Sequence, residues 1–207
     1  YYRDANLCLN DETFILNDPN ELNGSINTNS VVSCNSVCDA SLQFLISPGF
    51  TGTPGYTYSL NSSGTQNSSI FSGLCGNQTY DITVTDVNGC TYTDSIFVAE
   101  PDAITFNADV TSTSLFNGFG VSCNGSNDGE ITFSNILGGT PNFSFSIDGG
   151  VTFLSDSIFN NSNGSNISQG NYTVQVQDGA GCLSSTSNLI VTEPILFIAT
   201  AIELSLI

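Results

Sequence analysis

Seven cysteines are the residues of this chain with the clearest chemistry. The 207 residues contain no histidine, so the cysteine and histidine sets of zinc sites and of thiol proteases are missing. Cysteines at this density without histidine are typical of disulfides, which persist in an oxidising compartment. The composition therefore predicts a secreted or surface-exposed protein, with localisation at the cell surface or outside the cell.

Two turn motifs carry oxygen atoms that could bind calcium. One is an Asp-x-Asn-Gly turn at residues 86–89, and the other is an Asn-Asp-Gly turn at residues 127–129. Carboxylate and amide oxygens are the ligands that calcium prefers. The same residue types also favour tight turns with positive φ, which need no ion. The expected cofactors are therefore none, or calcium at the candidate ligands Asp86, Asn88, Asn127, Asp128 and Asp178.

Catalytic motifs are missing from the sequence. There is no Gly-x-Ser-x-Gly elbow and no phosphate-binding loop, and the acids that recur in the chain precede turns or follow strands, where aspartate commonly caps a turn. A catalytic pair of carboxylates needs a cleft in which one pKa is shifted away from the other. We expect no enzymatic activity.

The charge of the chain excludes two classes of partner. Nineteen acidic residues face one basic residue, Arg3, which gives a formal net charge of −18. Binding to nucleic acid or to anionic lipid requires clustered cations. No apolar run approaches the 18 or so residues that span a bilayer. We expect no nucleic acid partner and no direct insertion into a membrane.

A repeated octapeptide organises the chain. Gly52–Ser59 and Gly139–Ser146 both read Gly-Thr-Pro followed by aromatic residues that alternate with small polar ones. Each copy follows a Val-Ser-Cys-Asn motif (residues 32–35 and 121–124) and precedes a strand-like segment that ends in Asp-x-x-Gly-Cys (residues 80–90 and 172–182). The prolines that close each unit, Pro19, Pro101 and Pro194, are 82 and 93 residues apart. A period of this length indicates a small domain.

The repeats predict the domain boundaries and the strands. Residues 1–22 end a preceding repeat, 23–101 and 102–194 are complete repeats, and 195–207 begin a following one. Residues 23–31, rich in Asn and Ser, are expected to form a connection with little core of its own. Strands are expected at residues 13–16, 42–46, 56–60, 69–71, 80–86, 91–98, 104–111, 129–134, 143–147, 171–177 and 185–192.

Short alternating strands without any helical period predict an all-β fold. Units of about 85 residues with frequent turns suggest tandem immunoglobulin-like β-sandwiches arranged end to end. No tryptophan is present, so other rings must fill the core. The rings expected to point inward are Tyr56, Tyr58, Tyr80, Phe143, Phe145 and Tyr172.

The repeats also limit how the cysteines pair. Counting within each repeat favours Cys34 with Cys90, Cys38 with Cys75 and Cys123 with Cys182. The same count allows pairing across the junction, with Cys8 bound to Cys34, Cys90 to Cys123 and Cys182 to the next unit. Both schemes stay open, because a sequence does not show which Cα atoms approach within about 7 Å.

Five motifs in the same order resemble the SprB repeat of gliding-motility adhesins and other giant surface adhesins of the Bacteroidetes. Departures are Gly55 and Asn142, where the family has a second proline after Gly-Thr-Pro, and Leu60 and Ile147, where it has tryptophan. The resemblance implies export by the type IX secretion system, residence on the outer cell surface and a filamentous array. Asp-Ser-Ile resembles the O-glycosylation acceptor of that phylum, which makes Ser95 and Ser157 candidate acceptors.

We therefore interpret the chain as a structural and adhesive stalk segment of a long secreted surface filament. The alternative is a β-sandwich module that binds polysaccharide or another ligand through exposed aromatic side chains. The expected partners are neighbouring repeats of the same chain, together with surface polysaccharide or other filament subunits.

Overall fold

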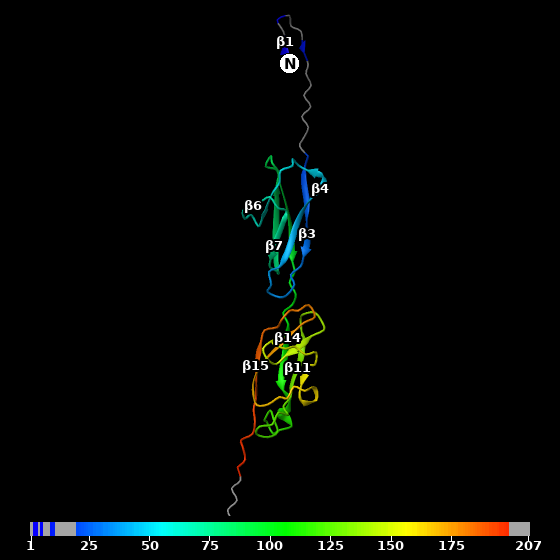
Figure 1. Cartoon of the computed structure of the whole chain (residues 1–207). Coiled ribbons are helices and arrows are strands. Elements are labelled where there is room, and N and C mark those ends of the chain that lie inside the picture. Colours follow the sequence, from blue (N-terminus) through cyan, green and yellow to red (C-terminus); the bar gives the residue numbers. More distant parts are fainter. Residues whose placement is uncertain (1, 4, 6–8, 11–19, 199–207) are drawn as a thin grey trace, which may run out of the picture. The chain divides into compact units, whose positions relative to one another are not determined.

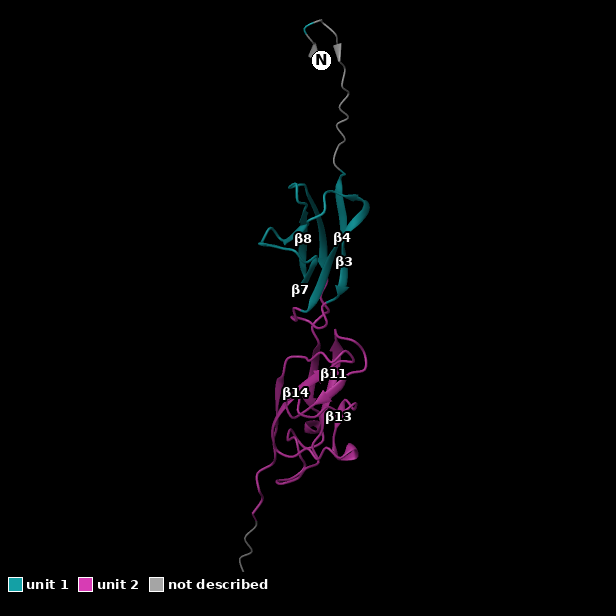
Figure 2. Cartoon of the chain, turned by 45° about the horizontal axis from the view of Figure 1, so that its top comes forward, with its two compact units in different colours: residues 1–31, 39–98 teal, residues 32–38, 99–207 magenta. Residues whose placement is uncertain are grey.

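The computed structural model describes residues 2–3, 5, 9–10 and 20–198 (Figure 1). The chain divides into two compact units, which Figure 2 colours separately: unit 1 is residues 1–31 and 39–98, and unit 2 is residues 32–38 and 99–207. Two short strands near the start, β1 (Tyr2–Arg3) and β2 (Leu9–Asn10), pair antiparallel. The strand expected at residues 13–16 lies outside the described residues.

Unit 1 is a sandwich of two antiparallel sheets. One sheet has the order β3 (Leu22–Ser30), β4 (Ala40–Thr51), β7 (Ile70–Leu74). The other has the order β6 (Thr65–Gln66), β5 (Thr57–Leu60), β8 (Gln78–Thr85), β9 (Thr91–Val98). Apolar residues alternate along the strands, as expected where one face of a sheet is buried. The largest fully buried side chains are those of Leu42, Phe44, Ile82 and Val84.

Unit 2 has the same strand order, except that its described residues contain no strand equivalent to β6. Its sheets are β10 (Thr105–Val110), β11 (Ile131–Leu137), β13 (Ile158–Phe159) and β12 (Ser144–Ser146), β14 (Gly170–Gln177), β15 (Ser187–Val191). Two 3₁₀ turns, η1 (Thr111–Ser114) and η2 (Asn161–Asn163), are the helical elements of the described residues. Phe133 packs at the centre, with ring centroids 5.0 Å from Phe145 and 5.8 Å from Phe159. The predicted all-β, immunoglobulin-like fold is confirmed.

The prediction for residues 23–31 is wrong, because they form most of strand β3. This strand supplies few apolar side chains of its own, and its partner β4 supplies Leu42 and Phe44 to the core. A Cβ on Gly24 would lie 2.3 Å from Cε1 of Phe44, so the strand fits by lacking a side chain under that ring. The equivalent strand in unit 2, β10, lies within the strand predicted at residues 104–111.

The repeated rings divide between buried and half-buried positions. Tyr58 and Phe145 are buried as predicted, whereas Tyr56 and Phe143 are half-buried. The hydroxyl of Tyr80 donates to the carbonyl of Cys75 (3.1 Å) and accepts from its N–H (3.0 Å). The hydroxyl of Tyr172 makes the same two bonds with Ser168, at 2.9 and 3.1 Å. Each tyrosine thus fixes the chain just before its strand, as in the tyrosine corner of immunoglobulin folds.

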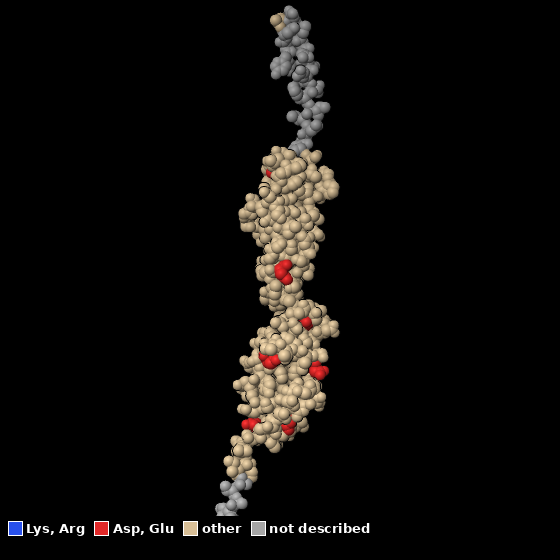
Figure 3. All heavy atoms as spheres, viewed as in Figure 1, with Lys and Arg blue, Asp and Glu red and all other residues tan. Residues whose placement is uncertain are grey.

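Acidic side chains are dispersed over the surface. In the view of Figure 3 they form small separate groups, and no basic side chain is visible among the described residues. Dispersed charge of one sign keeps a protein soluble and repels other copies of it.

Candidate functional site: a cysteine loop and an aspartate turn

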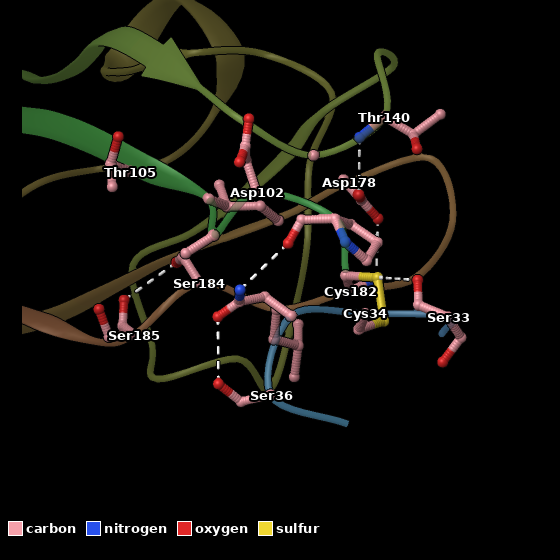
Figure 4. Close-up of a pocket in the computed structure, with 16 residues that line it drawn as sticks. Ser33, Cys34, Ser36, Asp102, Thr105, Thr140, Asp178, Cys182, Ser184 and Ser185 are labelled. Carbon is pink, nitrogen blue, oxygen red and sulfur yellow. Dashed lines mark hydrogen bonds between the residues drawn. A yellow bond between two sulfur atoms is a disulfide. The ribbon is translucent and has the colours of Figure 1, made fainter. Parts of the chain in front are cut away.

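The aspartate turn of unit 2 is the Asp-x-x-Gly-Cys segment at residues 178–182. Asp178 follows strand β14, and its Oδ1 accepts hydrogen bonds from the N–H groups of Ala180 (3.0 Å) and Cys182 (2.8 Å). Its Oδ2 accepts from the N–H of Thr140 at 2.8 Å (Figure 4). Burial raises the pKa of Asp178, but the hydrogen bonds from Thr140 and Cys182 outweigh it, so the pKa lies below its ordinary value.

Unit 1 contains the same turn. The carboxylate of Asp86 accepts from the N–H groups of Thr53 (2.9 Å), Asn88 (2.9 Å) and Cys90 (2.8 Å). The bond from Thr53 is the main cause of a lowered pKa for Asp86. The two repeated motifs therefore form one structure, in which Gly-Thr-Pro supplies the N–H that the aspartate of Asp-x-x-Gly-Cys accepts.

Glycine is required at the start of both Gly-Thr-Pro segments. Gly52 and Gly139 have φ of 57° and 64°, a region that favours glycine. A Cβ on Gly52 would lie 2.9 Å from Oδ2 of Asp86, and one on Gly139 would lie 3.0 Å from Oδ2 of Asp178. The close approach to the carboxylate therefore explains why the repeated octapeptide begins with glycine.

The cysteine loop is the second repeated feature. After Cys34 the chain turns back, with the N–H of Val37 donating to the carbonyl of Cys34 (3.2 Å) and Ser36 at a φ of 61°. The side-chain amide of Asn35 donates to the carbonyl of Pro101 at 3.0 Å, and the N–H of Ser36 donates to the carboxylate of Glu100. A Glu-Pro pair thus holds the loop.

The loop at Cys123 has the same construction. The N–H of Ser126 donates to the carbonyl of Cys123 (3.1 Å), and Gly125 has a φ of 79°. The amide of Asn124 donates to Glu193 (2.9 Å) and to the carbonyl of Pro194 (3.3 Å), and the N–H of Gly125 donates to Glu193 (2.7 Å). The recurring acids were expected only at turns and strand ends, so this role of the glutamates was not predicted, although Glu-Pro recurs with the cysteine motif.

A disulfide joins loop and turn in unit 2. Cys34 is bonded to Cys182, with their Cα atoms 5.5 Å apart and a sequence separation of 148. The Sγ of Cys182 also lies 3.3 Å from the carbonyl oxygen of Ser33. Loop and turn line a cavity of about 330 Å³ that residues 101–105, 139–140 and 183–185 complete (Figure 4).

Two of the three favoured disulfides are wrong, and so is the alternative scheme across the junction. Cys34 pairs with Cys182, which excludes Cys34 with Cys90 and Cys123 with Cys182, and Cys90 and Cys123 are free and exposed. The physical reason is that residues 32–38 make their contacts in unit 2, although they were assigned to the first repeat. Cys38 and Cys75 are both disulfide-bonded, and their pairing with each other stays a prediction.

The calcium candidates are divided between the two units. Asp86 and Asn88 lie in unit 1, where the side-chain amide of Asn88 donates to the hydroxyl of Thr53 (2.7 Å). Asn127, Asp128 and Asp178 lie in unit 2. The described residues contain no group of three or more acidic, cysteine or histidine side chains that could hold a metal ion. The expectation of no cofactor, with calcium at these residues as the alternative, stays a prediction.

Asp128 is hydrogen-bonded to Ser122, the residue before Cys123. Its carboxylate accepts from the N–H of Ser122 at 3.0 Å. Hydrogen bonds from the hydroxyl and the N–H of Ser122 lower the pKa of Asp128. The carboxylates of these turns therefore serve as acceptors for nearby donors, and their lowered pKa values do not suit a general acid near neutral pH.

The two candidate glycosylation sites differ in exposure. Ser95 is exposed on strand β9, and its hydroxyl donates to the carboxylate of Asp81 at 2.6 Å. Ser157 is half-buried, and its carbonyl accepts from the N–H of Phe133 (2.8 Å). Ser95 is thus the more accessible of the two.

Comparison with known proteins gives one family match. Residues 121–152, from the second cysteine loop through the second Gly-Thr-Pro, match the family described as SprB repeat, which confirms the resemblance to an SprB-type repeat. No curated protein matches the chain. SprB repeats are found in cell-surface proteins, and the disulfides fit an extracellular protein. In the described residues no helix is long and apolar enough to cross a membrane.

Several solved structures are similar to the chain. The three N-terminal domains of the highly immunogenic outer capsid protein Hoc of bacteriophage RB49 share 15% identity at a TM-score of 0.46, over 83% of this chain and 59% of that one. A C-terminal fragment of intimin, in complex with the intimin-binding domain of its translocated receptor, shares 8% identity at a TM-score of 0.36, over 85% and 64%. A two-domain fibronectin type III segment of chicken tenascin shares 15% identity at a TM-score of 0.25, over 85% and 99%. The chain spans about three fifths of the first two.

Proposed function

We propose that this chain is a stalk segment of a long secreted surface adhesin, in which β-sandwich repeats follow one another end to end and carry no catalytic activity. The observation that carries the proposal is that the loop held by Glu-Pro occurs twice with the same hydrogen bonds. In one copy the Glu-Pro pair accepts hydrogen bonds from Asn35 and Ser36, and in the other copy it accepts them from Asn124 and Gly125. A contact that recurs at the repeat period is what a regular array requires.

The acidic surface supports the same role. A net charge of −18 gives strong repulsion between copies, which keeps long molecules apart on a crowded surface. The near absence of Lys and Arg also leaves few sites for trypsin-like proteases. We further propose export through the type IX system, a place in a gliding-motility filament and O-glycosylation at Ser95 and Ser157, each of which follows from the resemblance to SprB repeats.

Small-angle X-ray scattering on proteins with two, four and six repeats tests the stalk. The eight-residue strands β8 and β9 are about 26 Å long at about 3.3 Å per residue. With its turns each repeat should therefore add roughly 30–40 Å, so the maximum dimension should grow linearly with repeat number. A maximum dimension that stays nearly constant between two and six repeats would contradict the proposal.

Ligand binding is the competing outcome. Of the ring positions that recur in the octapeptide, Tyr58 and Phe145 are buried and cannot stack on a sugar, and Tyr56 and Phe143 are half-buried. We therefore expect no binding of the purified chain to an array of bacterial polysaccharides. Saturable binding to one polysaccharide, lost on replacement of an exposed ring such as Phe97, would favour the module reading. Glycopeptide mass spectrometry of natively secreted protein tests Ser95 and Ser157, and unmodified serines there would end that part.

A further inference from the structure

We propose that the free cysteines Cys90 and Cys123 are the two halves of a repeated inter-repeat disulfide, each completed by another copy of the repeat. We call Cys123, in the Val-Ser-Cys-Asn loop, the loop cysteine, and Cys90, at the end of the Asp-x-x-Gly-Cys turn, the turn cysteine. Cys123 forms a disulfide with the turn cysteine of one further copy, and Cys90 forms a disulfide with the loop cysteine of another. The connection is the one that Cys34 and Cys182 already make in unit 2. This inference rests on the proposed function, because it requires more than two repeats to meet.

The turn that carries Cys90 is already in the bonded geometry. The N–H of Cys90 lies 2.8 Å from Oδ1 of Asp86, as that of Cys182 lies 2.8 Å from Oδ1 of Asp178. The N–H of each aspartate also donates to the carbonyl of its cysteine, at 2.9 and 3.0 Å. The two turns differ in what covers them, since Cys182 is 8% exposed beside its loop, whereas Cys90 is exposed.

The apolar surface beside the turn of Cys90 also matches the apolar surface beside the turn of Cys182. A Cβ on Gly52 would meet the side chain of Leu22 at 3.3 Å, and one on Gly139 would meet the side chain of Ile104 at 2.8 Å. Leu22 is the first residue of β3, Ile104 directly precedes β10, and both are buried aliphatic residues. Unit 1 therefore presents the same apolar floor and the same aspartate turn as the site that holds Cys34.

The loop that carries Cys123 is equally preformed. Its third residue, Gly125, has a positive φ as Ser36 does, and its fourth N–H closes onto the cysteine carbonyl as in the Cys34 loop. The hydrogen bonds to Glu193 and Pro194 reproduce those of the Cys34 loop to Glu100 and Pro101. Val121 and Val32, two residues before each cysteine, are both buried. Cys123 is thus held on a hydrogen-bonded loop, where it is free and exposed.

The loop that carries Cys123 and the turn that carries Cys90 have complementary surfaces. One copy of this chain offers a loop cysteine and another offers a turn cysteine, so the contact joins unlike surfaces and can continue from copy to copy. Each new bond removes a proton and an electron from each thiol, and a disulfide oxidant such as oxidised glutathione takes up the electron pair and becomes two thiols. Pairing of two loop cysteines or two turn cysteines has no such matched surface.

Mixing two single variants tests the pairing. Cys8 lies outside the described residues, so all proteins carry Cys8→Ser; one then carries Cys90→Ser and the other Cys123→Ser. They are incubated, alone and mixed, with reduced and oxidised glutathione at about 0.5 M NaCl, where screening within about 5 Å suppresses the repulsion between acidic copies. Covalent species are separated without reductant, and cross-linked peptides are identified by mass spectrometry.

The proposal predicts that the mixture forms a dimer through Cys90 and Cys123, with a yield at least about tenfold above either variant alone, because matched surfaces raise the effective concentration of the thiols. The protein with both cysteines should form a ladder of oligomers. Equal dimer yields from the mixture and from each variant alone would show adventitious pairing of exposed thiols and overturn the proposal, as would no dimer in the mixture. If the maximum dimension grows linearly with repeat number but no cross-links form, the stalk proposal is supported and the disulfide proposal is rejected. If cross-links form but the maximum dimension does not grow, the disulfide proposal is supported and the stalk proposal is rejected.

Discussion

Replacing Asp178 with asparagine should destabilise unit 2 by breaking the contact between the repeated octapeptide and the aspartate turn. Asparagine retains one acceptor oxygen, which can keep the bonds from Ala180 and Cys182 as neutral ones. Its amide nitrogen then faces the N–H of Thr140, where Oδ2 accepted at 2.8 Å. Losing one charge-assisted bond and weakening two costs about 2–4 kcal/mol.

The expected fall in melting temperature follows from the size of the unit. At roughly 4 °C per kcal/mol for a domain of about a hundred residues, Asp178→Asn should lower Tm by about 8–16 °C. Differential scanning calorimetry of the whole chain measures it, with unit 1 as an internal reference. The pKa of Asp178 is lowered in the folded state, so its stabilisation is present above the ordinary pKa of about 4 and is lost as the pH falls through the folded value. The difference between the two proteins should therefore shrink below about pH 4.

Asp109→Asn is the matched control. Asp109 is exposed on strand β10, and its replacement removes the same negative charge without touching the turn. Any gain from weaker overall repulsion should appear equally in both variants. If Asp178→Asn melts within about 1 °C of Asp109→Asn, a shift well under the roughly 4 °C per kcal/mol of such a domain, the turn does not stabilise the unit as argued.

Three further predictions concern acid, glycine and metal. Burial raises the pKa of Asp148, but hydrogen bonds from Thr152, Ser146 and Val151 together lower it to about 2. The stability lost in Asp148→Asn should therefore be full at pH 6 in urea titrations and disappear as the pH falls through about 2; a constant loss would contradict this. Gly139→Ala should cost roughly 1 kcal/mol more than Gly181→Ala in urea denaturation, since both have positive φ but only Gly139 has atoms within 4 Å of the added Cβ; equal losses would contradict the close approach. Adding millimolar calcium should leave Tm unchanged relative to EDTA, because backbone N–H groups already occupy both aspartate turns, whereas a rise that grows with calcium concentration would establish a site.

Local pattern was sufficient to predict the fold class and most of the strands. Alternation of aromatic and polar residues and the Gly, Pro and Asn turns are short-range signals. The strands that these signals predicted between β4 and β15 are present, some in unit 1 and the others in unit 2. Strand β3 was missed because its sequence is mostly polar. What makes it a strand is the partner β4, whose Leu42 and Phe44 supply the core. The repeat offered the missing signal, since the equivalent β10 is apolar enough to be recognised.

The site depended on contacts between distant residues. Both the octapeptide and the Asp-x-x-Gly-Cys turn were visible as motifs, but the bond from Thr140 to Asp178 spans 38 residues and leaves no local pattern. Pairing of the cysteines went wrong for the same reason. Counting assumes that a cysteine belongs with its neighbours in sequence, whereas the loop of Cys34 contacts Glu100, 64 residues on, and Cys182, 148 residues on. Composition was enough to predict that disulfides form, and the folded chain alone decided which thiols meet, because a bond requires their Cα atoms within about 7 Å.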